Sequence, residues 1–186
     1  MDGRKSIPEP FSSERMTSTE QSFRAELVGL LPRLRRFGRA LTRHREDADD
    51  LVQIAMERAL NHHAQWEPGT RLDSWMFRIM KNAWIDEVRA RRRSSEVLVS
   101  EDGIDSVGVA TPDSHLDSLA IRAAMLRLSE DQRVVVGLVL VEGMPYKEAA
   151  GVLEIPIGTL TSRLARARER LQELLTEDAV RPEPGR

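Results

Sequence analysis

Cysteine is absent from this chain of 186 residues. That absence excludes disulfide bonds, cysteine-ligated zinc, iron–sulfur clusters and thiol catalysis. No stretch approaches the roughly 18 consecutive apolar residues that would span a membrane, so no membrane insertion is expected. The N-terminal residues contain no apolar segment of the kind found in signal peptides. Together these absences predict a cytoplasmic protein.

Aromatic residues are also scarce, at 4% of the chain, whereas charged residues reach 31%. A β-sandwich would need more aromatic and β-branched residues, so this balance favours an all-α fold. The length accommodates one ordinary domain or two small ones.

Charge is distributed unevenly, although the net charge is only −2. Residues 20–93 have 15 basic and 11 acidic side chains, whereas residues 94–115 have five acidic side chains and no lysine or arginine. We therefore expect two small helical domains joined by a flexible acidic linker. The expected segments are a disordered tail (1–19), a first domain (20–93), the linker (94–115), a second domain (116–178) and a C-terminal tail (179–186).

Apolar residues in the first domain recur at three- and four-residue steps, which predicts amphipathic helices. The first runs from Phe23 to Leu41 and contains Pro32, a residue that can kink a helix. The second opens with acidic residues, and the third follows a turn at 67–70. The second helix is expected to bury its apolar side chains Leu51, Ile54, Ala55, Ala59 and Leu60.

The second domain is expected to begin with a helix over 116–128, and Ser129 should cap the next helix. The valine-rich run after Ser129 would also suit a strand, but the cap and Gly143 favour a helix. Residues 146–171 then show a short helix with small residues, a tight turn at 154–156 and a second helix, the pattern of a helix-turn-helix. Four arginines and one glutamate between Thr159 and Leu171 favour a reader of the DNA major groove over a merely solvated helix.

Two further segments are candidates for function. Residues 47–53 (DADDLVQ) contain three carboxylates within four residues, which suit a helix start, a metal site, paired-acid catalysis or an acidic docking face. Residues 75–93 interleave aromatic and basic side chains, a combination that fits single-stranded nucleic acid, although the aromatic residues could equally form a core.

No signature of a metalloprotease, serine hydrolase or nucleotide-binding loop is present. His62 and His63 are adjacent, so they point to different sides of a helix and make a poor metal site. We therefore expect no enzyme activity, no catalytic residue, no metal and no cofactor.

Taken together, the segments DADDLVQIAMERAL, FRIMKNAWIDEVRARRR and the helix-turn-helix resemble an extracytoplasmic-function (ECF) sigma factor of bacterial RNA polymerase. The resemblance covers about residues 21–176 and implies a sigma-2 domain followed by a sigma-4 domain. It implies an alternative sigma factor that binds core RNA polymerase and directs initiation at specific promoters, in a stress or envelope response. Pro68–Gly69–Thr70 resembles a loop of the general-stress sigma factors of alphaproteobacteria.

The resemblance also implies roles for individual residues. The first set binds the polymerase clamp coiled coil, the second reads and melts the promoter −10 element, and the third reads the −35 element. These sets are, in order: Asp47, Asp49, Asp50 and Gln53; Trp75, Arg78, Lys81, Asn82 and Arg89; Thr159, Thr161, Ser162, Arg163 and Arg166. The implied partners are core RNA polymerase (clamp and flap), promoter DNA and an anti-sigma factor.

Two other classes remain open on the sequence. A stand-alone DNA-binding regulator would bind duplex DNA without polymerase, but the net negative charge and the acidic linker argue against strong independent binding. A sigma-like decoy would bind a partner protein and never touch DNA, but the arginine-rich last helix argues against it.

Overall fold

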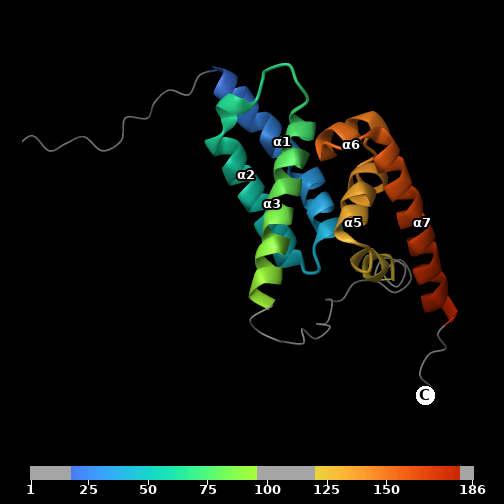
Figure 1. Ribbon diagram of the computed structural model, residues 1–186. Coiled ribbons are helices and arrows are strands. Elements are labelled where there is room, and N and C mark those ends of the chain that lie inside the picture. Colours follow the sequence, from blue (N-terminus) through green and yellow to red (C-terminus); the bar gives the residue numbers. More distant parts are fainter. Residues whose placement is uncertain (1–17, 96–119, 181–186) are drawn as a thin grey trace, which may run out of the picture.

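The computed structural model describes residues 18–95 and 120–180, and the regular structure of these residues is entirely helical (Figure 1). The expected N-terminal tail, linker and C-terminal tail lie almost wholly outside them. The first body consists of α1 (Ser18–Leu41), α2 (Arg45–Asn61), the short 3-10 turn η1 (His63–Gln65) and α3 (Leu72–Ser95).

The second body begins with a helix over residues 120–126. It continues through α5 (Glu130–Val136), the π-helical segment η2 (Gly137–Val141), α6 (Tyr146–Leu153) and α7 (Ile157–Val180). The all-α class with two helical bodies is therefore confirmed. In Figure 1, α7 is the outermost helix and α6 lies against one end of α3.

The predicted helices of the first body form, with one correction in α2. Pro32 lies inside α1 without ending it. The buried face of α2 contains Ala48, Leu51, Val52, Ala55 and Ala59. The prediction that Ile54 and Leu60 are buried is wrong, because both lie off this face and are 37% and 38% exposed. Val52 is buried in their place.

The valine-rich segment is a helix, as its cap predicted. The Ser129 hydroxyl accepts a hydrogen bond from the Gln132 backbone N–H, and the Gln132 side chain accepts one from the Ser129 N–H. This reciprocal pair, a capping box, satisfies two backbone donors that the first turn would otherwise leave free. The π-helical continuation over Gly137–Val141 was not predicted. Gly143, with a φ of +67°, follows it.

The helix-turn-helix has the predicted arrangement. Ala149, Ala150 and Val152 of α6 are buried, and so are Leu160, Leu164 and Ala167 of α7. Glu154 ends α6 in the left-handed region, with a φ of 58°. A non-glycine residue rarely adopts this conformation, so the tight turn itself holds Glu154 in it.

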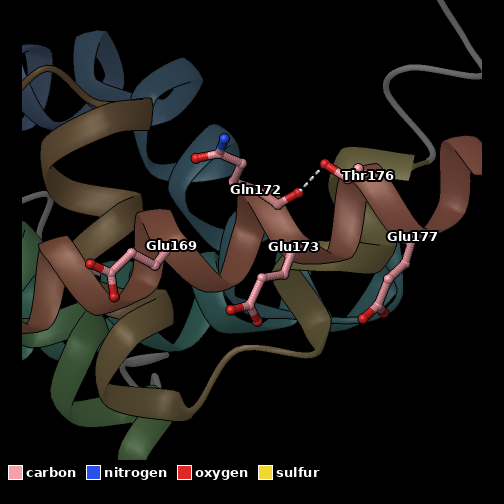
Figure 2. Close-up of a pocket in the computed structure, with 5 residues that line it drawn as sticks. All are labelled: Glu169, Gln172, Glu173, Thr176 and Glu177. Carbon is pink, nitrogen blue, oxygen red and sulfur yellow. Dashed lines mark hydrogen bonds between the residues drawn. The ribbon is translucent and has the colours of Figure 1, made fainter.

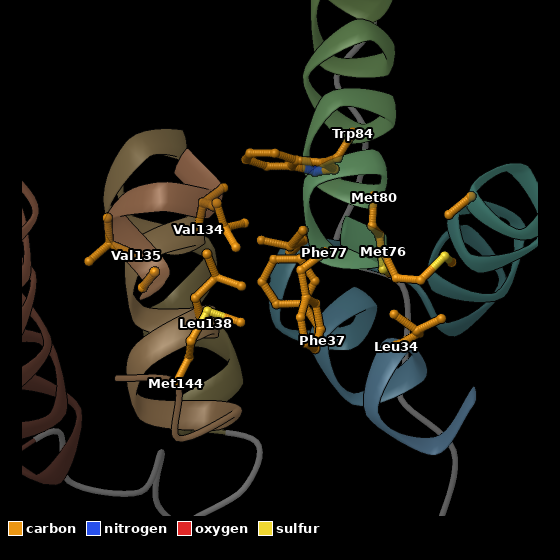
Figure 3. Close-up of a cluster of buried hydrophobic side chains, with 14 of the residues drawn as sticks. Leu34, Phe37, Met76, Phe77, Met80, Trp84, Val134, Val135, Leu138 and Met144 are labelled. Carbon is orange, nitrogen blue, oxygen red and sulfur yellow. The ribbon is translucent and has the colours of Figure 1, made fainter. Parts of the chain in front are cut away.

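The two bodies share one continuous apolar core, whereas the sequence predicted two domains joined by a flexible linker. Phe37 of α1 packs edge-on against Phe77 of α3, with ring centroids 5.2 Å apart. Both rings face Leu138 of the second body, while Trp84 lies beside Val134 (Figure 3). At Gly137 the approach is so close that an added Cβ would lie 2.8 Å from the Phe37 ring.

Candidate nucleic-acid and polymerase interfaces

The acidic residues predicted to dock on polymerase lie in the first two turns of α2. Asp49 and Asp50 are exposed, and Asp49 lies 3.6 Å from Arg35 and 3.9 Å from Arg45. Asp47 lies 3.5 Å from Arg91 of α3. These acids therefore suit the positive end of the helix dipole and also present negative charge to solvent.

Gln53 lies one turn further along α2, where its side chain donates to Glu57 over 3.0 Å. It is exposed. The structure thus brings all four predicted docking residues to the N-terminal half of one helix.

The residues predicted to read the −10 element all lie on α3, but their environments differ. Asn82 and Arg89 are exposed, whereas Trp75 is half-buried and packs edge-on against Phe23 at 6.2 Å. Arg78 is exposed and donates to the Gly151 carbonyl of α6 over 3.1 Å. Lys81 is 93% buried, leaving 7% of its surface exposed.

Burial lowers the pKa of the Lys81 ammonium, with Glu154 acting to raise it and Arg78 to lower it further. The Lys81 Nζ lies 3.9 Å from a Glu154 carboxylate oxygen. Lys81 therefore faces the second body rather than open solvent in this conformation.

The predicted −35 readers lie at the start of α7. Thr161, Ser162 and Arg166 are exposed, while Thr159 and Arg163 are half-buried. The Thr161 and Ser162 hydroxyls donate to carbonyls three residues earlier, each over 3.0 Å. Arg163 pairs with Asp131 of α5 at 2.8 Å, so it already has a partner within the second body.

Three glutamates of the second body, none of them predicted as functional from the sequence, bind polar and basic residues of the first body. Glu142 contacts Arg33 and Arg36. Glu148 contacts Arg71 and Ser74. Glu154 contacts Arg78 and Lys81. The glutamates' spacing of six residues is the only signal in the sequence, and it matches no helical period.

Arg33 and Arg71 also share a carboxylate, that of Asp73 at the start of α3, at 2.7 and 2.8 Å. Burial alone would raise the pKa of Asp73, but hydrogen bonds from Arg71 and Arg33 outweigh it and hold the pKa well below its usual range. Asp73 is therefore ionised and links the two arginines.

Aromatic side chains pack together where η1 ends and the loop to α3 begins. Trp66 and Phe23 have ring centroids 5.3 Å apart. Among the described residues, the Trp66 Nε1–H is the buried side-chain polar group without a hydrogen-bond partner. Over the same residues, no cluster of three His, Cys, Asp or Glu side chains could hold a metal ion.

The described helices include none that is both long enough and apolar enough to cross a membrane.

Two family models match the chain. "Sigma2 domain of PhyR" matches residues 27–81, from α1 into α3, and "Sigma-70, region 4" matches residues 118–171, including the helix-turn-helix. The fold and these matches define a two-domain transcription initiation factor of the sigma type.

The chain is 34% identical over 159 residues to the ECF RNA polymerase sigma factor EcfG of Rhodopseudomonas palustris (strain TIE-1), covering 86% of this chain and 88% of that protein. It is 34% identical over 142 residues to the ECF RNA polymerase sigma factor SigM of Mycobacterium tuberculosis (strain ATCC 35801 / TMC 107 / Erdman), covering 76% and 71%.

Two solved structures are similar. The sigma factor RpoE in complex with the anti-sigma factor NepR from Bartonella quintana matches with a TM-score of 0.74 and 35% identity, over 84% of this chain and 98% of that one. CnrH in complex with the cytosolic domain of CnrY matches with a TM-score of 0.66, over 87% and 92%, and its 24% identity supports the fold alone.

This chain belongs to the ECF RNA polymerase sigma factors. It is an alternative sigma factor, which directs transcription initiation together with core RNA polymerase, and the resemblance found in its sequence is confirmed. Sigma factors are initiation factors rather than enzymes.

Proposed function

We propose that this sigma factor recognises its promoters with α3 and α7 and binds core polymerase with the start of α2. The exposed acids Asp49 and Asp50, with Asp47 and Gln53, form the surface for the clamp coiled coil. Polymerase docking and −10 recognition belong to a domain over residues 20–93, and −35 recognition belongs to a domain over residues 116–178. An acidic linker over 94–115 joins the two domains.

The −10 element is read on α3. Asn82 and Arg89 are exposed along this helix, with Trp75 at its start. An unpaired base stacks on aromatic surface and hydrogen-bonds to polar groups, while Arg78 and Lys81 bind phosphates. Capture of a base from the displaced strand contributes to both melting and specificity.

The −35 element is read by the start of α7. The observation that carries this proposal is that Thr161, Ser162 and Arg166 are exposed on one helix of a helix-turn-helix whose opposite face is buried. Such a helix can enter the major groove and contact base edges. Thr159 and Arg163 flank them.

Regulation by an anti-sigma factor also fits, because the similar sigma factor RpoE of Bartonella quintana is solved in complex with the anti-sigma factor NepR. We extend this to the present chain as a partner of the same class. The protein would act in the bacterial cytoplasm, without catalytic residues of its own, in a stress or envelope response.

A transcription assay tests the proposal. Purified protein and core polymerase from the same bacterium are incubated with genomic fragments, and discrete new transcripts are expected. In that assay Arg166→Ala should weaken −35-dependent initiation by roughly tenfold, the effect of losing one base or phosphate contact. The control is Arg127→Ala, which removes an equal charge from the second body outside α7.

Unchanged transcription with Arg166→Ala would refute the −35 assignment. A stable complex with core polymerase that gives no transcripts would favour the sigma-like decoy. The absence of any complex, together with tight binding to duplex DNA, would favour a stand-alone regulator.

A further inference from the structure

We propose that Glu142, Glu148 and Glu154 form an internal latch, which holds the free sigma factor closed and occupies basic side chains that nucleic-acid phosphates would otherwise bind. The inference rests on the proposed function only for the DNA-binding role of Arg78 and Lys81. Closure of the two bodies by the latch stands on the contacts alone.

Glu142 forms the innermost pair of contacts. It follows η2 and bonds to two arginines of α1: Arg33 Nε at 3.1 Å and Arg36 Nε at 2.8 Å, with Arg36 Nη2 at 3.0 Å. Its side chain is fully buried. A buried carboxylate is stable only when it is paired and hydrogen-bonded, and here both paired arginines belong to the other body.

Glu148, in the first turn of α6, forms the middle contact. One carboxylate oxygen accepts a hydrogen bond from Arg71 Nη1 at 2.6 Å and the other accepts one from the Ser74 hydroxyl. Its side chain is only 17% exposed. Arg71 also pairs with Asp73, so the loop before α3 is tied to α6 through a network of charges.

Glu154 forms the outermost contact, over the proposed −10 surface. Its carboxylate oxygens lie 3.9 Å from Arg78 Nη1 and 3.9 Å from Lys81 Nζ. Arg78 is held further by the Gly151 carbonyl. The side chain of Glu154 is 62% exposed, so this contact is the weakest of the three and the easiest to open.

The latch and nucleic acid compete because they use the same donors. Guanidinium and ammonium groups bind carboxylate and phosphate oxygens with similar geometry. Lys81 is almost fully buried and its Nζ lies 3.9 Å from the Glu154 carboxylate, so a phosphate can reach it only after the turn between α6 and α7 moves away. Opening should therefore begin at Glu154, with Glu142 and the shared apolar core separating last.

The test uses the full chain without polymerase and compares two variants that remove three carboxylates each. The latch variant is Glu142→Gln, Glu148→Gln and Glu154→Gln together. The matched control is Glu169→Gln, Glu173→Gln and Glu177→Gln, which lie at four-residue steps along one side of α7 (Figure 2). The ion pairs of Glu177 with Arg127 and of Glu173 with Arg170 lie within the second body.

Separation of the bodies is measured by energy transfer between dyes on two introduced cysteines, Asn61→Cys in α2 and Arg168→Cys in α7. Both positions are exposed, and the sequence has no cysteine that would compete for the label. Nucleic-acid binding is measured by fluorescence anisotropy with a single-stranded DNA oligonucleotide of mixed sequence.

The expected result is lower energy transfer in the latch variant and roughly tenfold tighter binding of the oligonucleotide than in the control, which has the same net charge. Energy transfer equal to the wild type would overturn the latch without touching the promoter assignment. Lower energy transfer with binding no tighter than the control would overturn the competition.

Burial of Glu142 gives a reason to make a second variant, Glu148→Gln with Glu154→Gln. Its two sites are less buried, and circular dichroism checks that the helices are intact. A change of the same direction but smaller size is expected. Should the triple variant unfold, this double variant decides the question by the same two measurements.

Discussion

Arg133 of α5 donates a hydrogen bond of 2.9 Å to the carbonyl of Leu41, the last residue of α1. The same guanidinium donates to the carbonyls of Met125, Leu126 and Leu128, where the helix over 120–126 ends. One side chain therefore satisfies carbonyl groups at the ends of two helices, one from each body. Burial lowers the pKa of Arg133.

Replacement of Arg133 with alanine should lower the free energy of unfolding by about 2–4 kcal/mol, because several partly buried carbonyls lose a charged donor. Urea denaturation at pH 7 measures the change. Arg127→Ala, which removes an exposed arginine nearby, is the control and should cost under about 1 kcal/mol. Equal effects of the two substitutions would show that the Arg133 hydrogen bonds contribute nothing.

Gly137→Ala should also destabilise the protein, by about 1–3 kcal/mol, because the new Cβ would overlap the Phe37 ring. Gly151→Ala is the matched control in α6, where an added Cβ meets nothing within 4 Å. There the better helix propensity of alanine should stabilise by about 1 kcal/mol. Thermal unfolding compares the two, and a stabilising Gly137→Ala would contradict the packing of the bodies.

The free energy of unfolding should fall at acid pH, because protonation removes the charge of the Asp73 carboxylate. Its pKa in the folded state lies below the unfolded value of 3.8. Its stabilising contribution is therefore complete above the unfolded pKa and is lost as pH falls through the folded pKa. Asp73→Asn should cost about 1–3 kcal/mol at pH 7, and the deficit should shrink as the pH is lowered below 4.

Urea denaturation of the wild type and Asp73→Asn across that range measures this deficit. Asp50→Asn removes an exposed carboxylate of α2 and provides the control. A deficit for Asp73→Asn that stayed constant down to pH 2 would mean that the carboxylate charge is not what binds Arg33 and Arg71.

Reversing the charge of the α2 acids should abolish polymerase binding. Asp49→Arg with Asp50→Arg replaces two exposed carboxylates, and the two ion pairs of Asp49 are long and largely exposed, so the fold should be retained. A pull-down with core polymerase measures the loss. Glu169→Arg with Glu173→Arg on α7 is the charge-matched control; full recovery of complex with the α2 variant would refute the docking assignment.

Local signals predicted the helices well. The cap at Ser129, the small residues of α6 and the turn at 67–70 each depend on backbone chemistry within a few residues. Local signals could not predict that Val52 is buried and Ile54 exposed. Several faces of α2 contain apolar residues, and the helices packed against α2 determine which face is covered. The π-helical segment likewise has no local sequence signature.

The predicted site residues were found on the expected helices, but their environments depend on contacts between the bodies. Lys81 is buried and pairs with Glu154, which lies 73 residues later in the sequence. Long-range pairing of this kind leaves no periodic pattern in a single sequence. Family resemblance therefore named the residues, whereas only the three-dimensional arrangement showed which of them are covered.

The spacing of Glu142, Glu148 and Glu154 has a consequence for how this chain can vary. Six residues do not return to one face of an α-helix. All three carboxylates reach the first body because Glu142 follows the π-helical segment η2, Glu148 lies in the first turn of α6 and Glu154 adopts left-handed backbone angles. Inserting or deleting one residue between Gly143 and Leu153 would turn at least one glutamate away by about 100°. The length of the helix-turn-helix is thereby constrained twice, by the DNA groove that we propose it reads and by the first body, against which it packs.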